Sequence, residues 1–386
     1  MRAALASAPG VPARRKIVVF APSLQAVSGV STHARILLSS ELSREFDLLH
    51  FQVGSEGRGE NALRKLARLA LSPLQLALFL LRTGADTVHL NASLDAKGYW
   101  RDLIYWTVAR LLRRRVINQV HGGALPQEFF RGRALRTWLL RRFLVQSDAV
   151  TVLSSAELRA YRAFDARIKV RLVPNAIDPA GLLEEARAPG DGGPLRLAYL
   201  GRLSRAKGLL ELVAALALLA GAGRRFTLDI AGSGPLEAEL AAAVRAAGLG
   251  ERVRFLGTLA GADKARLWHA SDVFPLPSHF EGLPYALLEA MAAGAVPVVT
   301  RVGAMPDVVS EGRHGLFVPV ADAPALAEAI GALAADRASL ACMRAAGRVR
   351  VAAAFSIGRV AEDLRALYST LLKHHVRNRR LGRSPT

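Results

Sequence analysis

Short apolar runs alternate with helix-length intervals along almost the whole chain. In the first half, runs rich in valine, isoleucine and leucine occupy residues 16–21, 46–51, 87–90, 116–120, 149–153 and 170–173. A run of this length without polar alternation is typical of a parallel strand buried on both faces. Because the intervals are long enough for crossover helices, we expect an α/β domain with a doubly wound parallel sheet.

A polar stretch rich in proline and glycine, residues 184–194, interrupts this alternation. It predicts a linker at residues 185–194 between one domain at 16–184 and a second at 195–356. After the linker, apolar runs return at residues 195–200, 226–231, 252–256, 273–276, 296–300 and 316–318. We therefore expect two Rossmann-like domains in tandem, with the carboxyl ends of their strands facing one cleft.

The two ends of the chain fall outside these domains. Residues 1–15 are expected to form a flexible extension, and they lack the long apolar core of a secretory signal. Residues 357–373 have a helical pattern, and residues 374–386 are predicted to be a frayed basic tail. The lone Cys342 forms no intramolecular disulfide, which favours a reducing, cytoplasmic location.

The apolar stretch at residues 69–81 is the longest in the chain. As a helix it would measure about 20 Å, against about 30 Å for a bilayer core. Pro73 and Gln75 also interrupt it, so we expect that it does not span a membrane. It is either an ordinary core helix or part of a surface that touches lipid.

The charge of the chain indicates the kind of partner that it binds. The chain has 386 residues, 51% of them hydrophobic, with 52 lysines and arginines against 32 aspartates and glutamates, a net charge of +20. Residues 1–190 hold 28 of the basic and 15 of the acidic residues, so the first domain carries most of the excess. Such a field favours phosphate-bearing partners: nucleotides, nucleic acid or an anionic membrane surface.

One predicted helix supplies a candidate for membrane contact. A helical wheel of residues 101–115 places Arg110, Arg113 and Arg114 on one face with Trp106. Basic residues beside an aromatic anchor suit a lipid headgroup interface. We therefore expect a peripheral protein whose first domain docks on the inner face of the plasma membrane.

The strongest chemical motif is PSHFEGLPYALLEAM at residues 277–291. It follows a predicted strand, and its second half begins a helix. Free N–H groups at a helix N-terminus form an anion site suited to phosphate, and Gly282 permits close backbone approach. Glu281 lies in the loop, and Glu289 lies about two turns into the helix, where a carboxylate can accept hydrogen bonds from ribose hydroxyls.

Two further motifs follow predicted strands in the second half. GRLSRAKG at residues 201–208 places Arg202 and Lys207 where they can hold a diphosphate, although it lacks the spacing of a Walker loop. AGSGP at residues 231–235 contains Gly234 in a tight turn. It lacks the third glycine of a dinucleotide fingerprint, so it gives no support for NAD binding.

The first domain offers weaker signals at two strand ends. Ser28 and Gly29 follow the first strand, where backbone N–H groups can meet a phosphate or a sugar. His121 ends the fourth strand and can bond a sugar hydroxyl or move a proton. The chain contains neither an Asp-x-Asp pair nor a zinc-type Cys/His spacing, so no metal and no other cofactor is expected.

Taken together, these motifs resemble those of the retaining glycosyltransferase family 4, whose members have the GT-B fold of two facing Rossmann-like domains. The resemblance covers nearly the whole chain and is most specific in the motifs at residues 201–208, 231–235 and 277–291. It departs from the family pattern at Ser28, where a first glycine is common. It also departs at Ala304 and Asp307, where glycine and glutamate are usual.

The resemblance implies a role for each matching residue. Arg202 and Lys207 would hold the diphosphate of a nucleotide-sugar donor, linked to UDP or GDP, and Glu289 would bind the ribose. Glu281 would contact the transferred sugar, beside backbone N–H groups of Gly282 and Leu283. Gly29 and Gly234 would lie in loops that bind the donor. His121 would lie near the reacting carbon and complete the set of catalytic and donor-binding residues.

The resemblance also implies transfer with retention to a lipid-linked or polysaccharide acceptor in cell-envelope or exopolysaccharide synthesis. Two other functions stay open from the sequence. A nucleotide-sugar epimerase of the same fold would need no acceptor, which fits the basic first domain less well. A nucleic-acid-binding protein is disfavoured, because no recognised binding motif is present and aromatic residues make up only 6% of the chain.

Overall fold

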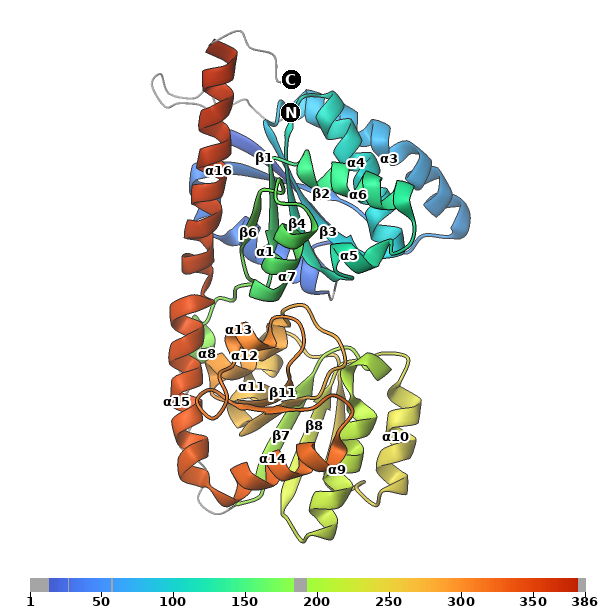
Figure 1. The fold of residues 1–386 in the computed structure, drawn as a ribbon. Helices are drawn as coiled ribbons and strands as arrows, with labels where there is room; N and C mark the ends of the chain where they lie inside the picture. Colours follow the sequence, from blue (N-terminus) through green and yellow to red (C-terminus); the bar gives the residue numbers. More distant parts are fainter. Residues whose placement is uncertain (1–13, 27, 57, 184–192, 381–386) are drawn as a thin grey trace, which may run out of the picture.

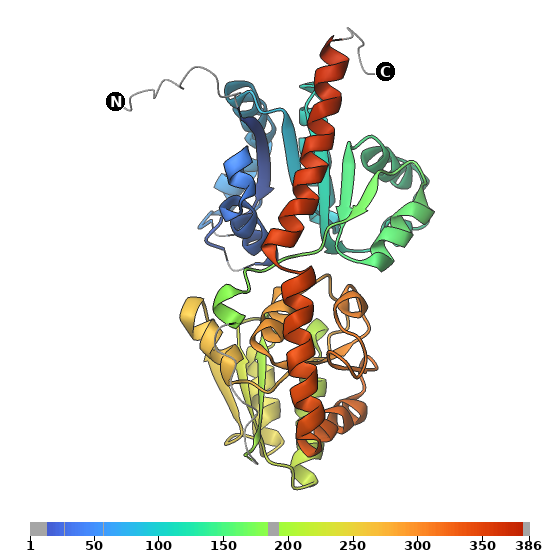
Figure 2. The ribbon, with the colours of Figure 1, turned by 90° about the vertical axis from the view of Figure 1, so that its left-hand side faces the viewer.

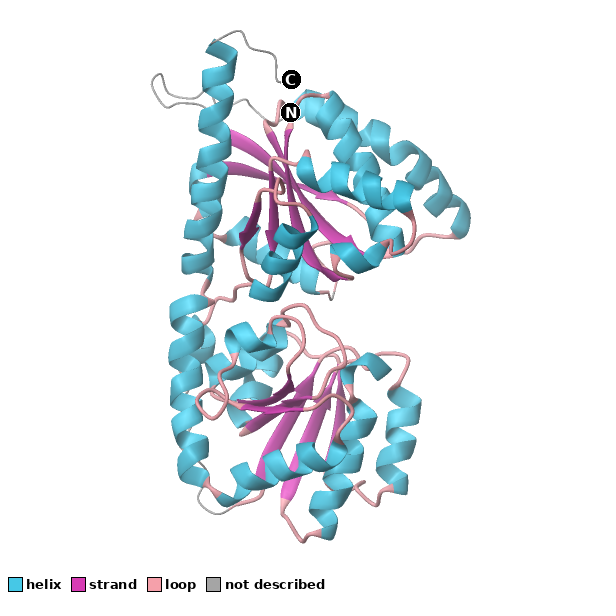
Figure 3. Ribbon diagram, viewed as in Figure 1, coloured by secondary structure: helices cyan, strands magenta, loops and turns pink. Residues whose placement is uncertain are grey.

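The computed structural model describes residues 14–26, 28–56, 58–183 and 193–380, with side chains described as far as residue 372. Two lobes lie one above the other, and each has a central sheet with helices on both faces (Figures 1 and 3). The predicted extension at residues 1–15 and the linker at 185–194 fall largely on residues outside these ranges. Residues 381–386 of the predicted tail also lie outside them.

The first domain has a six-stranded parallel sheet in the order β2-β1-β3-β4-β5-β6. Its strands are β1 (Arg15–Ala21), β2 (Phe46–Gln52), β3 (Thr87–Leu94), β4 (Arg115–Gly123), β5 (Ala149–Val152) and β6 (Val170–Leu172). Its helices are α1 (Gly29–Ser39), α2 (Leu42–Glu45), α3 (Ala62–Thr83), α4 (Ala96–Leu111), α5 (Pro126–Phe129), α6 (Ala134–Val145), α7 (Ser155–Phe164) and α8 (Ala180–Leu183). The strand order reverses between β1 and β3, which is a topological switch point.

The second domain has a six-stranded parallel sheet in the order β12-β11-β10-β7-β8-β9. Its strands are β7 (Leu195–Leu200), β8 (Phe226–Ala231), β9 (Val253–Gly257), β10 (Val273–Leu276), β11 (Val296–Thr300) and β12 (Leu316–Val318). Its helices are η1 (Arg205–Lys207, 3-10), α9 (Leu209–Gly221), α10 (Glu237–Ala246), α11 (Gly261–Ala270), α12 (Tyr285–Ala293), α13 (Met305–Val308), α14 (Ala323–Ala335) and α15 (Arg337–Ala354). The switch point lies between β7 and β10, so the loops after these two strands are the expected ligand loops.

The last helix, α16 (Ile357–Arg380), returns to the first domain after α15, and the two helices run end to end along one side of the molecule (Figure 2). Val360, Leu364 and Leu367 are buried in one core cluster with Ile17 and Val19 of β1. This helix therefore completes the first domain across the chain. The prediction that it ends at residue 373 is wrong, because the helix continues through seven residues that were assigned to the basic tail.

The predicted basic face around Trp106 is also wrong. Trp106 is buried, and its Nε1 donates a hydrogen bond of 3.1 Å to Ser147 Oγ. Its ring packs edge-on against Phe143 of α6. Arg110 is occupied by an ion pair of 3.2 Å with Asp148. The helix turns this aromatic residue toward the core, where burial of a large ring stabilises the domain more than exposure would.

The helix α3 is longer than the sequence suggested. Pro73 lies inside the helix. A proline has no N–H to offer the carbonyl four residues earlier. Here the Ser72 hydroxyl donates to that carbonyl, on Leu69, at 3.2 Å. By length and composition the 22-residue helix is long and apolar enough to cross a membrane.

Candidate active site at the switch points

The loops at the carboxyl edge of the second sheet touch one another backbone to backbone. A Cβ added to Gly208 would lie 2.0 Å from the carbonyl oxygen of Pro277, and one added to Gly232 would lie 1.9 Å from that of Gly201. A Cβ on Gly303 would lie 2.1 Å from the carbonyl oxygen of Glu281. Only glycine allows such approaches, so these glycines fix how the loops after β7, β8, β10 and β11 are stacked.

Gly234 belongs to this packing, since a Cβ there would lie 2.2 Å from the carbonyl oxygen of Leu203. The structure therefore gives Gly234 a packing role. It holds the loop after β8 against the loop that carries Arg202 and Lys207.

Replacing Gly208 with alanine is expected to lower the free energy of unfolding by about 2–5 kcal/mol, through backbone strain plus overlap with Pro277. Gly223→Ala is a matched control, because Gly223 has a similar φ of 69° against 67° but nothing within 4 Å of the added Cβ. Urea denaturation of both variants measures the difference. Equal losses in the two variants would show that the close approach contributes nothing.

Lys207 and Glu281, both predicted site residues, are in contact. The Lys207 Nζ forms an ion pair with Glu281 Oε1, and Ser278 Oγ donates to the same oxygen at 2.9 Å. Glu281 is buried while Lys207 keeps partial access to solvent. Arg202 lies in the same loop after β7 and is exposed, and no carboxylate in the described part of the chain pairs with its guanidinium. Arg205 of the same loop pairs with Glu239, so the loop presents two paired cations and one available cation.

The start of α12 provides an anion-binding feature. Among the described residues, no group accepts a hydrogen bond from the backbone N–H of Gly282 or Leu283. The Leu283 carbonyl, in contrast, accepts a bond of 2.7 Å from Asn175 Nδ2 of the first domain. Free amides at the positive end of a helix dipole attract a phosphate or another anion.

Glu289 lies within α12 and is buried. Its Oε1 pairs with Lys264 Nζ of α11 at 2.5 Å, and its Oε2 lies 3.4 Å from Trp268 Nε1. The sequence analysis missed Lys264. The only signal was that a buried carboxylate needs a cation, and nothing in the spacing of 25 residues identifies which one.

His121 lies near the end of β4, in the first domain. Asn91 Nδ2 donates to the Phe20 carbonyl at 2.6 Å, so its Oδ1 is an acceptor. His121 Nε2 lies 2.7 Å from that oxygen and must carry the proton. Burial lowers the pKa of His121 to about 3, so the ring is neutral and its Nδ1 is an unprotonated acceptor.

Predicted site residues of the two domains lie close together where the domains meet. A Cβ on Gly282 would lie 3.2 Å from the His121 carbonyl oxygen, and one on Gly29 would lie 3.9 Å from Tyr285 Cδ2. Asp307 Oδ2 accepts a bond of 2.6 Å from the backbone N–H of Ser155, at the start of α7. The sequence departure at Asp307 thus serves as a link between the domains, which sequence reasoning did not foresee.

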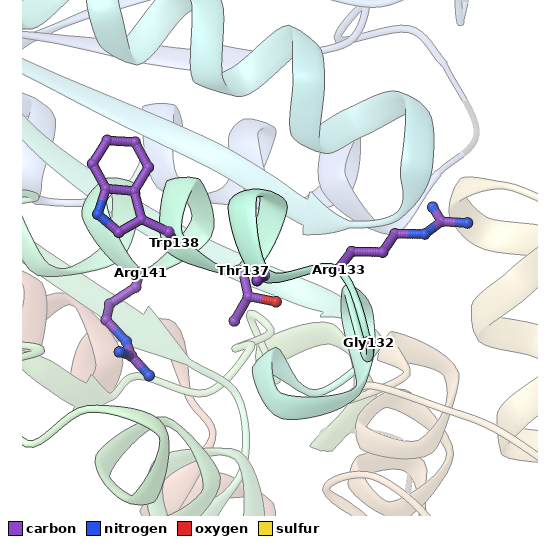
Figure 4. Close-up of a pocket in the computed structure, with 6 residues that line it drawn as sticks. Gly132, Arg133, Thr137, Trp138 and Arg141 are labelled. Atoms are coloured by element: carbon purple, nitrogen blue, oxygen red, sulfur yellow. The ribbon is translucent and has the colours of Figure 1, made fainter.

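The described residues contain no group of three or more His, Cys, Asp or Glu side chains placed to hold a metal ion. A shallow cavity of about 390 Å³ lies on and before α6 and contains none of the predicted site residues (Figure 4). It is lined by Gly132, Arg133, Ala134, Thr137, Trp138 and Arg141.

Three buried histidines, His33, His89 and His121, make stability dependent on pH. Burial lowers the pKa of His33 well below 6.5 and that of His89 to about 4. The unfolded chain binds protons near pH 6.5 while these folded sites do not. Each therefore contributes stability that is present above pH 6.5 and is lost, at about 1.4 kcal/mol per pH unit, as the pH falls toward 4. The pKa of buried Asp102 is raised to about 6, so this carboxyl stabilises the folded protein as the pH falls below 6. This single group offsets only part of the loss from the three histidines.

We expect His89→Gln to flatten the fall in unfolding free energy between pH 6 and 4.5 by about 1.4 kcal/mol per pH unit. His279→Gln is the control, because His279 is partly exposed and pairs with Glu211. Urea denaturation at several pH values measures both slopes. A His89→Gln slope identical to that of the unmodified protein would contradict the assignment.

Two family models match the chain. The model described as "Glycosyl transferases group 1" matches residues 194–336, and the model described as "Glycosyltransferase Family 4" matches residues 41–180. These ranges fall in the second and first domains respectively.

Curated relatives and solved structures agree with these matches. The chain is 32% identical to 2-deoxystreptamine glucosyltransferase of Streptomyces kanamyceticus over 62% of this chain and 64% of that protein. It is 31% identical to alpha-maltose-1-phosphate synthase of Mycolicibacterium smegmatis over 61% of this chain and 67% of that protein. The chain spans 42–64% of the length of four curated relatives, of which 2-deoxystreptamine glucosyltransferase is one. Sucrose-phosphate synthase of Thermosynechococcus elongatus superposes with a TM-score of 0.76 at 22% identity, covering 94% of this chain and 100% of that chain. This likeness confirms the predicted architecture.

Proposed function

This chain belongs to the group 1 glycosyltransferases, and on that premise we propose that it transfers a glycosyl group from a nucleotide-diphosphate-sugar to a lipid-linked or polysaccharide acceptor. The donor carries UDP or GDP. The observation that carries this proposal is the grouping of Lys207, Arg202 and the free amides of Gly282 and Leu283 at the switch point of the second sheet.

This grouping matches the charge that develops during transfer. The bond between the anomeric carbon and the diphosphate oxygen breaks, and its electron pair stays on the diphosphate. Arg202, Lys207 and the N-terminus of α12 stabilise that negative charge, so the reaction needs no metal ion. Lys207 is paired with Glu281, so a bound diphosphate competes with this carboxylate for the ammonium group.

The remaining residues contact the sugar. Glu281 accepts hydrogen bonds from the sugar hydroxyls, and the neutral His121 offers Nδ1 from the opposite side of the cleft. No carboxylate is assigned as a nucleophile, because Glu281 is assigned to the sugar hydroxyls and accepts a hydrogen bond from Ser278 Oγ. The acceptor oxygen therefore attacks from the face that the diphosphate leaves, its proton passes to a departing phosphate oxygen, and the anomeric configuration is retained.

The acceptor side is the strongly basic first domain. A lipid diphosphate or an acidic glycan is attracted by this field, and a lipid-linked acceptor places the protein at the inner, cytoplasmic face of the plasma membrane. The proposal thus includes transfer with retention, a donor linked to UDP or GDP, and a location at the membrane.

A thermal-shift screen against UDP-, GDP- and ADP-sugars tests the donor class. One donor is expected to raise the apparent melting temperature with rising concentration, because a ligand that binds only the folded state stabilises it by mass action. Transfer with that donor is expected to continue in EDTA. Absence of a shift with every nucleotide-sugar would contradict the proposal, and turnover that alters the sugar without an acceptor would favour an epimerase instead.

A further inference from the structure

The outer face of α3 is apolar. Leu63, Leu74 and Leu81 lie along one side of this helix and are 78%, 59% and 59% exposed. They follow the helical repeat, and Leu66, Leu71 and Leu78 lie beside them, also exposed. An amphipathic helix of a globular domain normally turns such a stripe toward the core. Here the stripe faces away from the protein.

The opposite side of α3 packs against the core of the first domain. Ser72, Leu76 and Leu80 are its buried residues, and the two leucines belong to the core cluster under α3, α4 and α6. Every residue from 61 to 71 except the partly buried Arg68 is exposed. The first half of the helix thus projects from the domain, in agreement with its position at the edge of the molecule (Figure 1).

Within α3, α4 and α6 every exposed charged residue is basic. The helices α3 and α6 contain no acidic residue, and Asp102, the acidic residue of α4, is buried. The exposed basic residues of α3 and α6 are Arg64, Lys65, Arg82, Arg136, Arg141 and Arg142. The adjoining helices also expose Trp100 and Trp138, the latter beside Arg141 in the shallow cavity of Figure 4.

We propose that α3 lies in the plane of an anionic lipid bilayer, with its leucine face inserted among the acyl chains and the surrounding arginines and lysines at the headgroups. Apolar burial together with attraction to anionic lipid is what holds interfacial helices on membranes. The helix does not span, because Leu76 and Leu80 are buried in the core of the first domain, in one cluster with Val18 of β1 and Val88 of β3. This surface replaces the face around Trp106, and it deepens the proposed membrane location.

Cosedimentation of the full chain with vesicles tests the docking surface. The unmodified protein is expected to bind vesicles of phosphatidylcholine with phosphatidylglycerol and to bind pure phosphatidylcholine much less. The variant Leu63→Gln, Leu74→Gln and Leu81→Gln is expected to lose about 10–100-fold in partition coefficient. The variant Leu218→Gln, Leu256→Gln and Val349→Gln changes three exposed apolar residues of the second domain and is expected to bind like the unmodified protein.

Other outcomes overturn the proposal in identifiable ways. Undiminished vesicle binding by the α3 variant contradicts it. Protein that survives alkaline carbonate extraction indicates a spanning helix. The unmodified protein could instead self-associate and fail to bind vesicles. If the α3 substitutions abolish that self-association, the leucine face contacts a second copy of the chain. Donor stabilisation measured by thermal shift in the same variants separates this result from the proposed transfer, because α3 carries no residue of the donor site.

Discussion

Lys207→Ala is expected to reduce the turnover number by about 10²–10³-fold while leaving acceptor affinity unchanged. Its ammonium group is assigned to the leaving diphosphate, and removal of one preorganised charge from a developing anion has effects of this size. Steady-state transfer with the donor found by thermal shift measures it. Turnover within twofold of the unmodified protein would remove Lys207 from the reaction.

This substitution also has a structural cost that must be separated from the chemical one. Without Lys207, the buried Glu281 carboxylate retains only Ser278 as a partner, and the free energy of unfolding is expected to fall by about 1–3 kcal/mol. The double variant Lys207→Met with Glu281→Gln removes the unpaired charge. It is expected to recover most of this stability in urea denaturation without recovering turnover. Recovery of turnover with stability would make the pair purely structural.

Glu289→Gln is expected to weaken donor binding by about 10–100-fold with a smaller change in turnover. Hydrogen bonds from ribose hydroxyls to a carboxylate contribute about 1.5–3 kcal/mol to the free energy of donor binding. The effect is expected in the dissociation constant because the ribose is remote from the bond that breaks. Titration calorimetry with the nucleoside diphosphate measures it directly.

Glu251→Gln provides the matched control for this experiment, since Glu251 is an exposed residue of the second domain. It is expected to bind donor with unchanged affinity. If Glu289→Gln binds as tightly as this control, the pair of Glu289 with Lys264 serves only to hold α11 against α12.

Much of the fold was predictable because it depends on local pattern. Runs of apolar residues identified all twelve strands of the described structure, including the short β12. The basic face around Trp106 was predicted wrongly because tertiary contacts override the local pattern. A helical wheel of α4 cannot show that Phe143 packs on Trp106.

The site was predictable where motif and strand end coincide. Lys207, Glu281, Gly282 and Glu289 each follow or lie near β7 or β10, and the structure brings Lys207 to Glu281. Their partners were not predictable, since they are set by the packing of distant segments. The contact between Ser155 and Asp307 joins residues 152 positions apart, and no local pattern encodes a pairing at that separation.

The role of α16 was hidden for the same reason. Tyr368 OH lies 2.7 Å from His89 Nδ1 across 279 positions of sequence, so the C-terminal helix carries part of the polar network behind His121. From the sequence, only a helical pattern at residues 357–373 could be predicted.

A crystal structure with the nucleoside diphosphate that the thermal-shift screen selects is the most direct measurement of the central claim. We predict phosphate oxygens within about 3.5 Å of the Arg202 guanidinium, the Lys207 ammonium and the amides of Gly282 and Leu283, with the ribose against Glu289. A nucleotide bound elsewhere, or one whose phosphates leave the Lys207–Glu281 pair intact, would contradict it.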